Sequence, residues 1–178
     1  MPFYEELDMK LAVLVFVGLY VGACGQSSVS YSDLDGMGAA YPQAPDTEMT
    51  PGMLCANPDY YRYDEQIPYC KRDVHTSTKR EIIKEYDREF GYNVEHMPRS
   101  QFKIDHYIPL CAGGSNKKSN LWPQHNSVFR HTDPIEQKVC QLMSGGDMLQ
   151  QEAVSIIRHV KFNLGDARRI IRELDNRL

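Results

Sequence analysis

Residues 102–143 combine two short strand patterns with the start of a helix, and this combination constrains the fold more than any other part of the chain. The run FKIDHYIPL, residues 102–110, and the run LWPQ, residues 121–124, have the residue types of strands. The intervening residues 111–119 are rich in Gly, Ser and Asn, which favours the loop of a hairpin. Asp133-Pro134-Ile135-Glu136 then supplies an N-cap, a proline at the first helical position and an N3 carboxylate. The order predicts a ββα unit.

Further helices are expected on both sides of this unit. Thr78-x-x-Glu81 has the form of a capping box, and Gly91 follows the apolar positions of that segment as a stop. The helix that starts at Asp133 is expected to end at Gly145-Gly146, and two more are expected over about 148–160 and 166–174. Strands in one segment and helices in others predict an α+β fold.

The first 24 residues have the features of an export signal. Residues 11–23, LAVLVFVGLYVGA, form an apolar run of signal-peptide length, shorter than the roughly 20 residues that span a bilayer. A start at Met9 gives the run a basic n-region, so we expect Met9 to be the true start. Val-Gly-Ala-Cys24 resembles a bacterial lipobox, in which Cys24 becomes the lipidated first residue; the alternative is ordinary secretion with cleavage near Ala23. Either reading predicts an exported protein of the bacterial cell envelope, periplasmic or anchored to a membrane through lipid, or a secreted one.

Composition separates a leader from a folded domain. Residues 25–53 lack apolar periodicity and are rich in Ser, Gly, Pro and Asp, so they predict a flexible linker, with the domain over residues 54–178. Residues 1–70 carry 2 basic and 10 acidic side chains, whereas residues 71–178 carry 18 basic and 14 acidic ones. Residues 71–178 are therefore basic, which favours polyanionic partners such as nucleic acid.

Export gives the cysteines a structural interpretation. Without Cys24, four remain, an even number with no Cys-x-x-Cys spacing, which favours disulfides over a zinc site. Four cysteines allow three pairings, and proximity in the sequence favours Cys55–Cys70 and Cys111–Cys140.

The segment DHYIPLCAGGSNKKSNLWPQH, residues 105–125, resembles the HNH endonuclease motif of the ββα-metal superfamily. The resemblance covers about residues 100–143 and rests on the Asp-His pair, the Gly-Gly-Ser-Asn loop and the Asn-Leu-Trp-Pro that opens the second strand. It implies a ββα-metal core and a hydrolase that cuts phosphodiester bonds of DNA, with RNA as the second candidate substrate, at low sequence specificity. It also implies one divalent metal ion, Mg²⁺ before Mn²⁺.

Within this resemblance each motif residue takes a role. His106 is the expected general base, Asp105 a metal ligand, and Asn120 the catalytic-loop asparagine that aims His106. A regular strand directs Asp105 and His106 to opposite faces, so the role of Asp105 comes from the resemblance and not from the spacing.

The chain departs from the family at the third ligand. The family places a His or Asn about nine residues after the middle Asn, and this chain has Phe129 there. His125 and His131 are the alternatives for a metal ligand.

Basic residues flank the motif, and a second class of function follows from the departure at Phe129. Side chains that could contact phosphates or be merely solvated are Arg99, Lys103, Lys117, Lys118 and Arg130. The alternative function is a non-catalytic envelope lipoprotein that binds DNA on an HNH-like scaffold. A disulfide-stabilised structural lipoprotein is a third reading.

Overall fold

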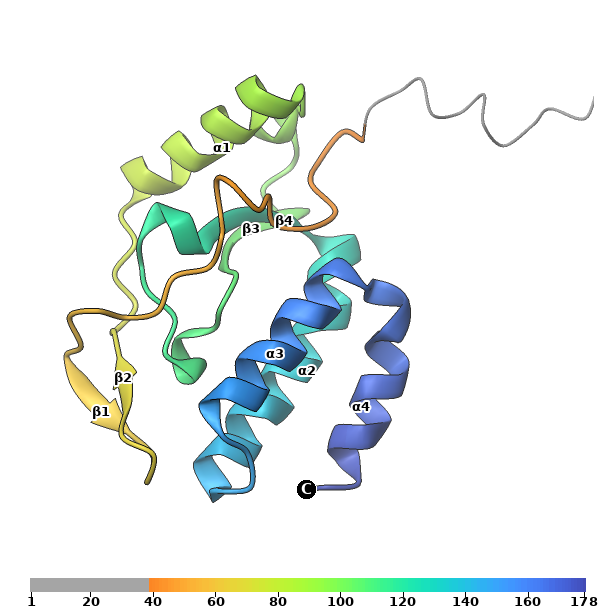
Figure 1. Ribbon diagram of the computed structural model, residues 1–178. Helices are drawn as coiled ribbons and strands as arrows, with labels where there is room; N and C mark the ends of the chain where they lie inside the picture. The colour runs from red at the N-terminus through yellow and green to blue at the C-terminus, as the bar shows by residue number, and fades with distance from the viewer. Residues whose placement is uncertain (1–38) are drawn as a thin grey trace, which may run out of the picture. The chain divides into compact units, whose positions relative to one another are not determined.

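Strands β3 (Phe102–His106) and β4 (Leu121–His125) form the expected antiparallel hairpin at the centre of the domain (Figure 1). The computed structural model describes residues 39–178; the export signal, the lipobox at Cys24 and the first part of the linker lie outside these residues. The register pairs His106 with Leu121 and Asp105 with Trp122. The fold is α+β, as the sequence predicts.

Helix α2 (Asn126–Gly145) follows β4 without a break, which completes the strand–strand–helix order. The predicted N-cap at Asp133 is wrong, because the N-cap is His125, eight residues earlier, and the helix encloses Pro134. His125 is the N-cap, and its side chain accepts a hydrogen bond from the backbone N–H of Ser127. Gly146, with φ of 82°, ends the helix in the left-handed conformation that the Gly-Gly pair predicts.

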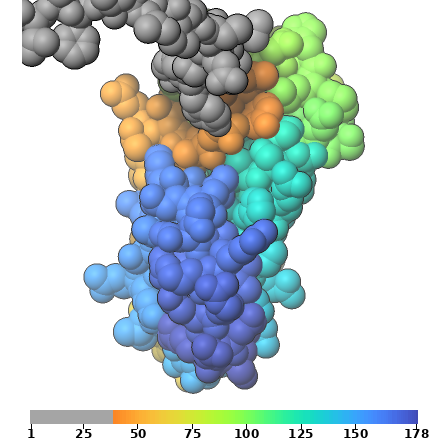
Figure 2. Space-filling model, turned by 90° about the vertical axis from the view of Figure 1, so that its right-hand side faces the viewer, coloured from red at the N-terminus to blue at the C-terminus, as the bar shows by residue number. Residues whose placement is uncertain are grey.

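Helices α3 (Gln150–Phe162) and α4 (Ala167–Asp175) both pack against α2, and each begins one or two residues later than predicted (Figure 1). Figure 2 shows atoms of the C-terminal helices (blue) forming much of one side of the domain. The core between the three helices contains Ile135, Val139, Leu142, Ile157, Val160 and Ile170.

Helix α1 (Thr76–Phe90) packs against β4 and shares a second apolar core with the hairpin. The predicted capping box is wrong, because the helix begins at Thr76, two residues before Thr78, and His75 at the N-cap makes no side-chain cap. Glu81 instead pairs with Lys118 Nζ at 3.0 Å. The predicted stop at Gly91 is confirmed, with φ of 70°.

A second hairpin, β1 (Tyr60–Arg62) with β2 (Ile67–Tyr69), was not expected from the sequence. Its turn places the non-glycine residues Tyr63 and Gln66 at positive φ, so the usual glycine signal is missing. Both expected disulfides are confirmed: Cys55–Cys70 ties β2 to the preceding segment, and Cys111–Cys140 ties the β3–β4 loop to α2. Such bonds suit an oxidising, exported environment.

The domain begins before the expected boundary at Leu54. Thr50 is fully buried, and its Oγ1 lies 2.7 Å from Tyr86 Oη and donates to the Leu121 carbonyl at 3.1 Å. The later part of the predicted linker therefore packs on α1 and β4 although it lacks helix and strand. Among residues 39–178, no helix combines the length and apolar character that crossing a membrane requires.

Candidate active site

The alternation of β3 separates the two motif residues onto opposite faces of the hairpin. His106 shares its face with Phe102 and Ile104, and Asp105 shares the other face with Lys103. This is the arrangement expected of a regular strand. The imidazole and the carboxylate therefore belong to two neighbouring groups of side chains, one on each side of the β3 backbone.

The His106 imidazole is buried, with 2% of the residue exposed, and is held by one side chain. Its Nε2 lies 3.0 Å from Asn116 Oδ1, and Asn116 Nδ2 donates to the Lys71 carbonyl at 2.6 Å. Because the Lys71 carbonyl takes the amide donor, Oδ1 faces the ring and Nε2 carries the proton. The unprotonated Nδ1 is buried and has no hydrogen-bond partner in residues 39–178.

Burial sets the protonation state of this ring. Desolvation lowers the pKa of His106 to about 4, and the hydrogen bond to Asn116 opposes the shift. The imidazole is therefore neutral near pH 7, with a free lone pair on Nδ1. This is the state that a general base requires before it accepts a proton.

Asn120 fixes the loop that follows β3. Its Oδ1 accepts from the Ile108 N–H at 2.9 Å, and its Nδ2 donates to the carbonyls of Ile108 and Ser115 at 3.0 and 2.9 Å. Gly114 lies in the same loop, where an added Cβ would come within 1.8 Å of the Ile108 carbonyl oxygen. These contacts are those of a loop-pinning asparagine; its part in catalysis stays a prediction.

On the other face of β3, Asp105 lies in a group of three carboxylates. The other two, Asp133 and Glu136, come from α2. One oxygen from each lies within 4.8 Å of the others. Two lysines neutralise this group: Lys161 Nζ lies 3.2 Å from Asp105 Oδ2 and 2.7 Å from Glu136 Oε1, and Lys103 Nζ lies 2.8 Å from Asp133 Oδ1. Lys161 is completely buried and also donates to the His106 carbonyl at 2.6 Å.

The pKa values in this group follow from burial and from the two lysines. Burial alone would raise the pKa of Asp105, but the charges of Lys161 and Lys103 outweigh it and hold that pKa below its ordinary value. Burial raises the pKa of Glu136 to about 7, against the charge of Lys161. Burial would lower the pKa of Lys161, but Glu136 and Asp105 raise it. The group therefore changes its charge near neutral pH through Glu136.

The donor chemistry of the three carboxylates fits a hard divalent cation, since Mg²⁺ prefers oxygen ligands. The residues that we expected to complete such a site lie elsewhere. His125 is four residues along the hairpin from His106, about 13 Å away, where its ring stacks on Tyr41. His131 lies about 200° around α2 from Asp133. The structure brings neither of them to Asp105.

Four residues of the site were not predicted as site residues from the sequence: Asn116, Asp133, Glu136 and Lys161. Asp133 and Glu136 were assigned to a helix cap, although their i,i+3 spacing also places them on one helix face. Phe129 lies one turn before Asp133 on α2, and Lys103 Nζ is 5.0 Å from the centre of its ring. No local sequence pattern indicates that Lys161 belongs to the site.

The basic residues expected to meet phosphates differ in their contacts. Lys103 and Lys118 are engaged by carboxylates: Lys118 Nζ lies 2.6 Å from Glu85 Oε1. Lys117 and Arg130 are exposed and form no ion pair in the part of the chain that the structure describes. Arg99 lies over the Phe102 ring, with its Cζ 4.9 Å from the centre.

Comparison with known proteins gives no match for this chain, whether to protein-family models, to curated proteins or to solved structures.

Proposed function

We propose that this protein is a metal-dependent endonuclease of the HNH type, which hydrolyses phosphodiester bonds of DNA, and of RNA as a second substrate, with low sequence preference. The observation that carries the proposal is the state of His106. Its Nδ1 is buried and has no hydrogen-bond partner among residues 39–178, Asn116 holds Nε2, and the adjacent Asp105 belongs to a group of three carboxylates.

His106 acts on the attacking water. The water gives a proton to Nδ1 as its oxygen attacks phosphorus, and Asn116 Oδ1 accepts from Nε2–H throughout. A pKa of about 4 makes this ring a weak base in the free protein. The negative charge of a bound phosphodiester raises the pKa toward the working pH, because it stabilises the imidazolium.

The carboxylates of Asp105, Asp133 and Glu136 would hold the divalent cation, Mg²⁺ or Mn²⁺. When bound, such an ion neutralises the phosphate charge and stabilises the leaving oxygen. The three side chains come from β3 and α2, the two elements of the ββα unit. Lys161 and Lys103 compete with the cation for the same oxygens.

The two disulfides support an exported enzyme. A signal peptide that ends at Ala23, with lipid on Cys24 and a place in the bacterial envelope, completes the proposal. Residues 71–178 carry 18 basic and 14 acidic side chains, and contact of this part with the nucleic acid backbone would give binding without reading bases.

The test is degradation of plasmid DNA and of RNA by the full chain with its disulfides formed. The assay includes Mg²⁺, Mn²⁺ or EDTA, and compares His106→Ala with His96→Ala, a matched change at an exposed histidine. We expect metal-dependent cutting that EDTA abolishes, that His106→Ala reduces by about 10²–10⁴-fold, and that His96→Ala leaves unchanged. Full activity in His106→Ala would refute the mechanism.

A second candidate is a protein that binds DNA without cutting it. The observation that favours it is Lys161, whose buried ammonium already neutralises two of the three carboxylates. This candidate predicts salt-dependent DNA binding that survives EDTA, with no cleavage in either metal.

A further inference from the structure

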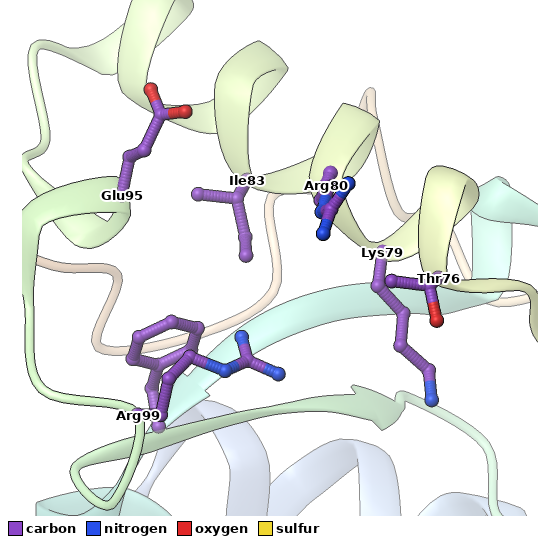
Figure 3. Close-up of a pocket in the computed structure, with 7 residues that line it drawn as sticks. Thr76, Lys79, Arg80, Ile83, Glu95 and Arg99 are labelled. Atoms are coloured by element: carbon purple, nitrogen blue, oxygen red, sulfur yellow. The ribbon is translucent and has the colours of Figure 1, made fainter.

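A cavity of about 360 Å³ lies between α1 and the beginning of β3 (Figure 3). Thr76, Lys79, Arg80 and Ile83 enter it from α1, Arg99 from the segment before β3, and Phe102 from β3 itself. The volume is within the range of pockets that hold small ligands and is large enough for one nucleotide unit.

The cavity has a cationic rim. Lys79, Arg80 and Arg99 form no ion pair within residues 39–178, whereas Lys84, Arg88, Lys103 and Lys118 all have acidic partners. Figure 3 shows the Arg99 and Lys79 side chains reaching into the space below α1. The one carboxylate on the rim, Glu95, lies 3.8 Å from Lys84 Nζ, which offsets its charge. The rim therefore favours an anion.

The floor of the cavity is apolar. Ile83 and Phe102 are buried there, and the Arg99 guanidinium lies over the Phe102 ring with 4.9 Å between its Cζ and the ring centre. A guanidinium stacked in this way keeps its N–H edges free for an anionic oxygen. An apolar floor below a cationic rim suits a sugar and base with their phosphate, and not an isolated inorganic ion.

The position of the cavity relates it to His106. Phe102 and His106 project from the same face of β3, four residues apart, which corresponds to about 13 Å along the strand. Arg72, just before α1, contributes to the electrostatic environment of the His106 ring. Cationic side chains, from Arg72 to those around the cavity, therefore extend along β3 from its His106 end to its Phe102 end.

We propose that this cavity binds one backbone phosphate of the nucleic acid strand, together with the adjoining nucleotide, a few nucleotides away from the bond that His106 attacks. The inference rests on the proposed function and adds a substrate subsite to it. Lys79 and Arg99 contact the phosphate, and Phe102 supports the nucleotide.

Binding can be measured without cleavage in the full chain carrying His106→Ala, by fluorescence anisotropy of a labelled single-stranded octanucleotide over a range of salt concentrations. The test variant adds Lys79→Glu and Arg99→Glu. The control adds Arg88→Glu, which reverses a charge on α1 outside the cavity, at a residue paired with Glu89. Circular dichroism verifies that all three proteins are folded.

We expect the cavity variant to bind about tenfold or more weakly, equally for different base sequences, and to lose about 0.7 or more from the slope of log affinity against log salt. The control should keep both quantities. With His106 restored, the cavity substitutions should raise KM for the octanucleotide and leave kcat nearly unchanged.

Equal affinity in the cavity variant and its parent, or an equal loss in the Arg88→Glu control, would overturn the subsite while wild-type cleavage still supported the nuclease. A wild-type chain that neither bound nor cut nucleic acid would overturn both proposals.

Discussion

Lys161 Nζ lies 3.2 Å from Asp105 Oδ2, and both side chains are buried although 56 residues separate them in the chain. The same ammonium contacts Glu136 and donates to the His106 carbonyl. One cation from α3 thus joins the first motif strand to α2. It lies between two of the three carboxylates that we propose as ligands of a divalent ion.

Replacement of Lys161 by Met should destabilise the metal-free domain by about 3–5 kcal/mol, because it leaves buried carboxylates without their cation. If these carboxylates bind metal, Mn²⁺ should raise the melting temperature of Lys161→Met by more than that of the wild type. Thermal unfolding in EDTA and in Mn²⁺ measures both effects. Lys138→Met, at a half-buried lysine of α2 that pairs with Asp175 outside this group, is the control. No response of Lys161→Met to Mn²⁺ would argue against a metal at this place.

Substitution of Asp133 by Asn should weaken Mn²⁺ binding by about tenfold or more, since it removes one charged oxygen ligand from the three. The Asp133 side chain is 45% exposed, so the fold should survive. Isothermal titration with Mn²⁺ gives the affinity. Asp175→Asn, at an exposed carboxylate on α4, should leave it unchanged.

Substitution of Asn116 by Ala should reduce cleavage by about 10–100-fold, because Asn116 fixes the ring orientation and the tautomer of His106. Nitrogen NMR of the histidine ring distinguishes this role from a general loss of structure: the proton should reside on Nε2 in the wild type and be shared between both nitrogens in the variant. Lys117→Ala, at the exposed next residue, should keep the wild-type spectrum. An unchanged tautomer in Asn116→Ala would contradict the assignment.

The buried His106 should make the metal-free protein less stable in acid. Its folded pKa of about 4 is below the ordinary value of 6.5, so the unfolded chain binds more protons between these pH values. Stability should therefore fall as the pH decreases through this window, by about 3 kcal/mol from this group. Glu136, with its pKa raised to about 7, acts in the opposite direction between about 4.5 and 7.

Comparison with His106→Gln isolates the histidine contribution. Urea unfolding in EDTA at a series of pH values should show a smaller loss of stability on acidification for this variant than for the wild type. Identical pH dependence of the two proteins would show that His106 is not held neutral by burial.

Asn120→Ala should lower stability by about 3 kcal/mol or more, since it leaves the buried Ile108 N–H and the Ile108 and Ser115 carbonyls without their partner. His106→Gln should cost much less at pH 7, because the ring makes one hydrogen bond. Urea unfolding at pH 7 compares the two. A fully stable Asn120→Ala protein with lost cleavage would instead assign Asn120 a direct part in the reaction.

Several features of this domain are encoded within a few residues and could be predicted. The period of two places Asp105 and His106 on opposite faces of β3, and glycines at positive φ end α1 and α2 where the pattern stops. The Gly-Gly-Ser-Asn loop indicates the hairpin, and Asn120 is the residue whose side chain holds the loop by hydrogen bonds. The short separations within the cysteine pairs favour the observed disulfides. Each depends on backbone geometry or on contacts between nearby segments.

Long-range contacts decided what the sequence left open or concealed. The Asp133-Pro134-Ile135-Glu136 pattern is typical of a helix N-terminus, but α2 starts earlier because its apolar face continues back to Val128. The carboxylates of Asp133 and Glu136 pair instead with lysines from β3 and α3. Thr50 lies in a stretch without apolar periodicity, and its burial depends on contacts with the distant residues Tyr86 and Leu121. By itself the sequence predicted the β3–β4 hairpin, the four longer helices and the two disulfides. Only the tertiary structure decided which charges share a buried site, since ion pairs between distant segments have no local pattern.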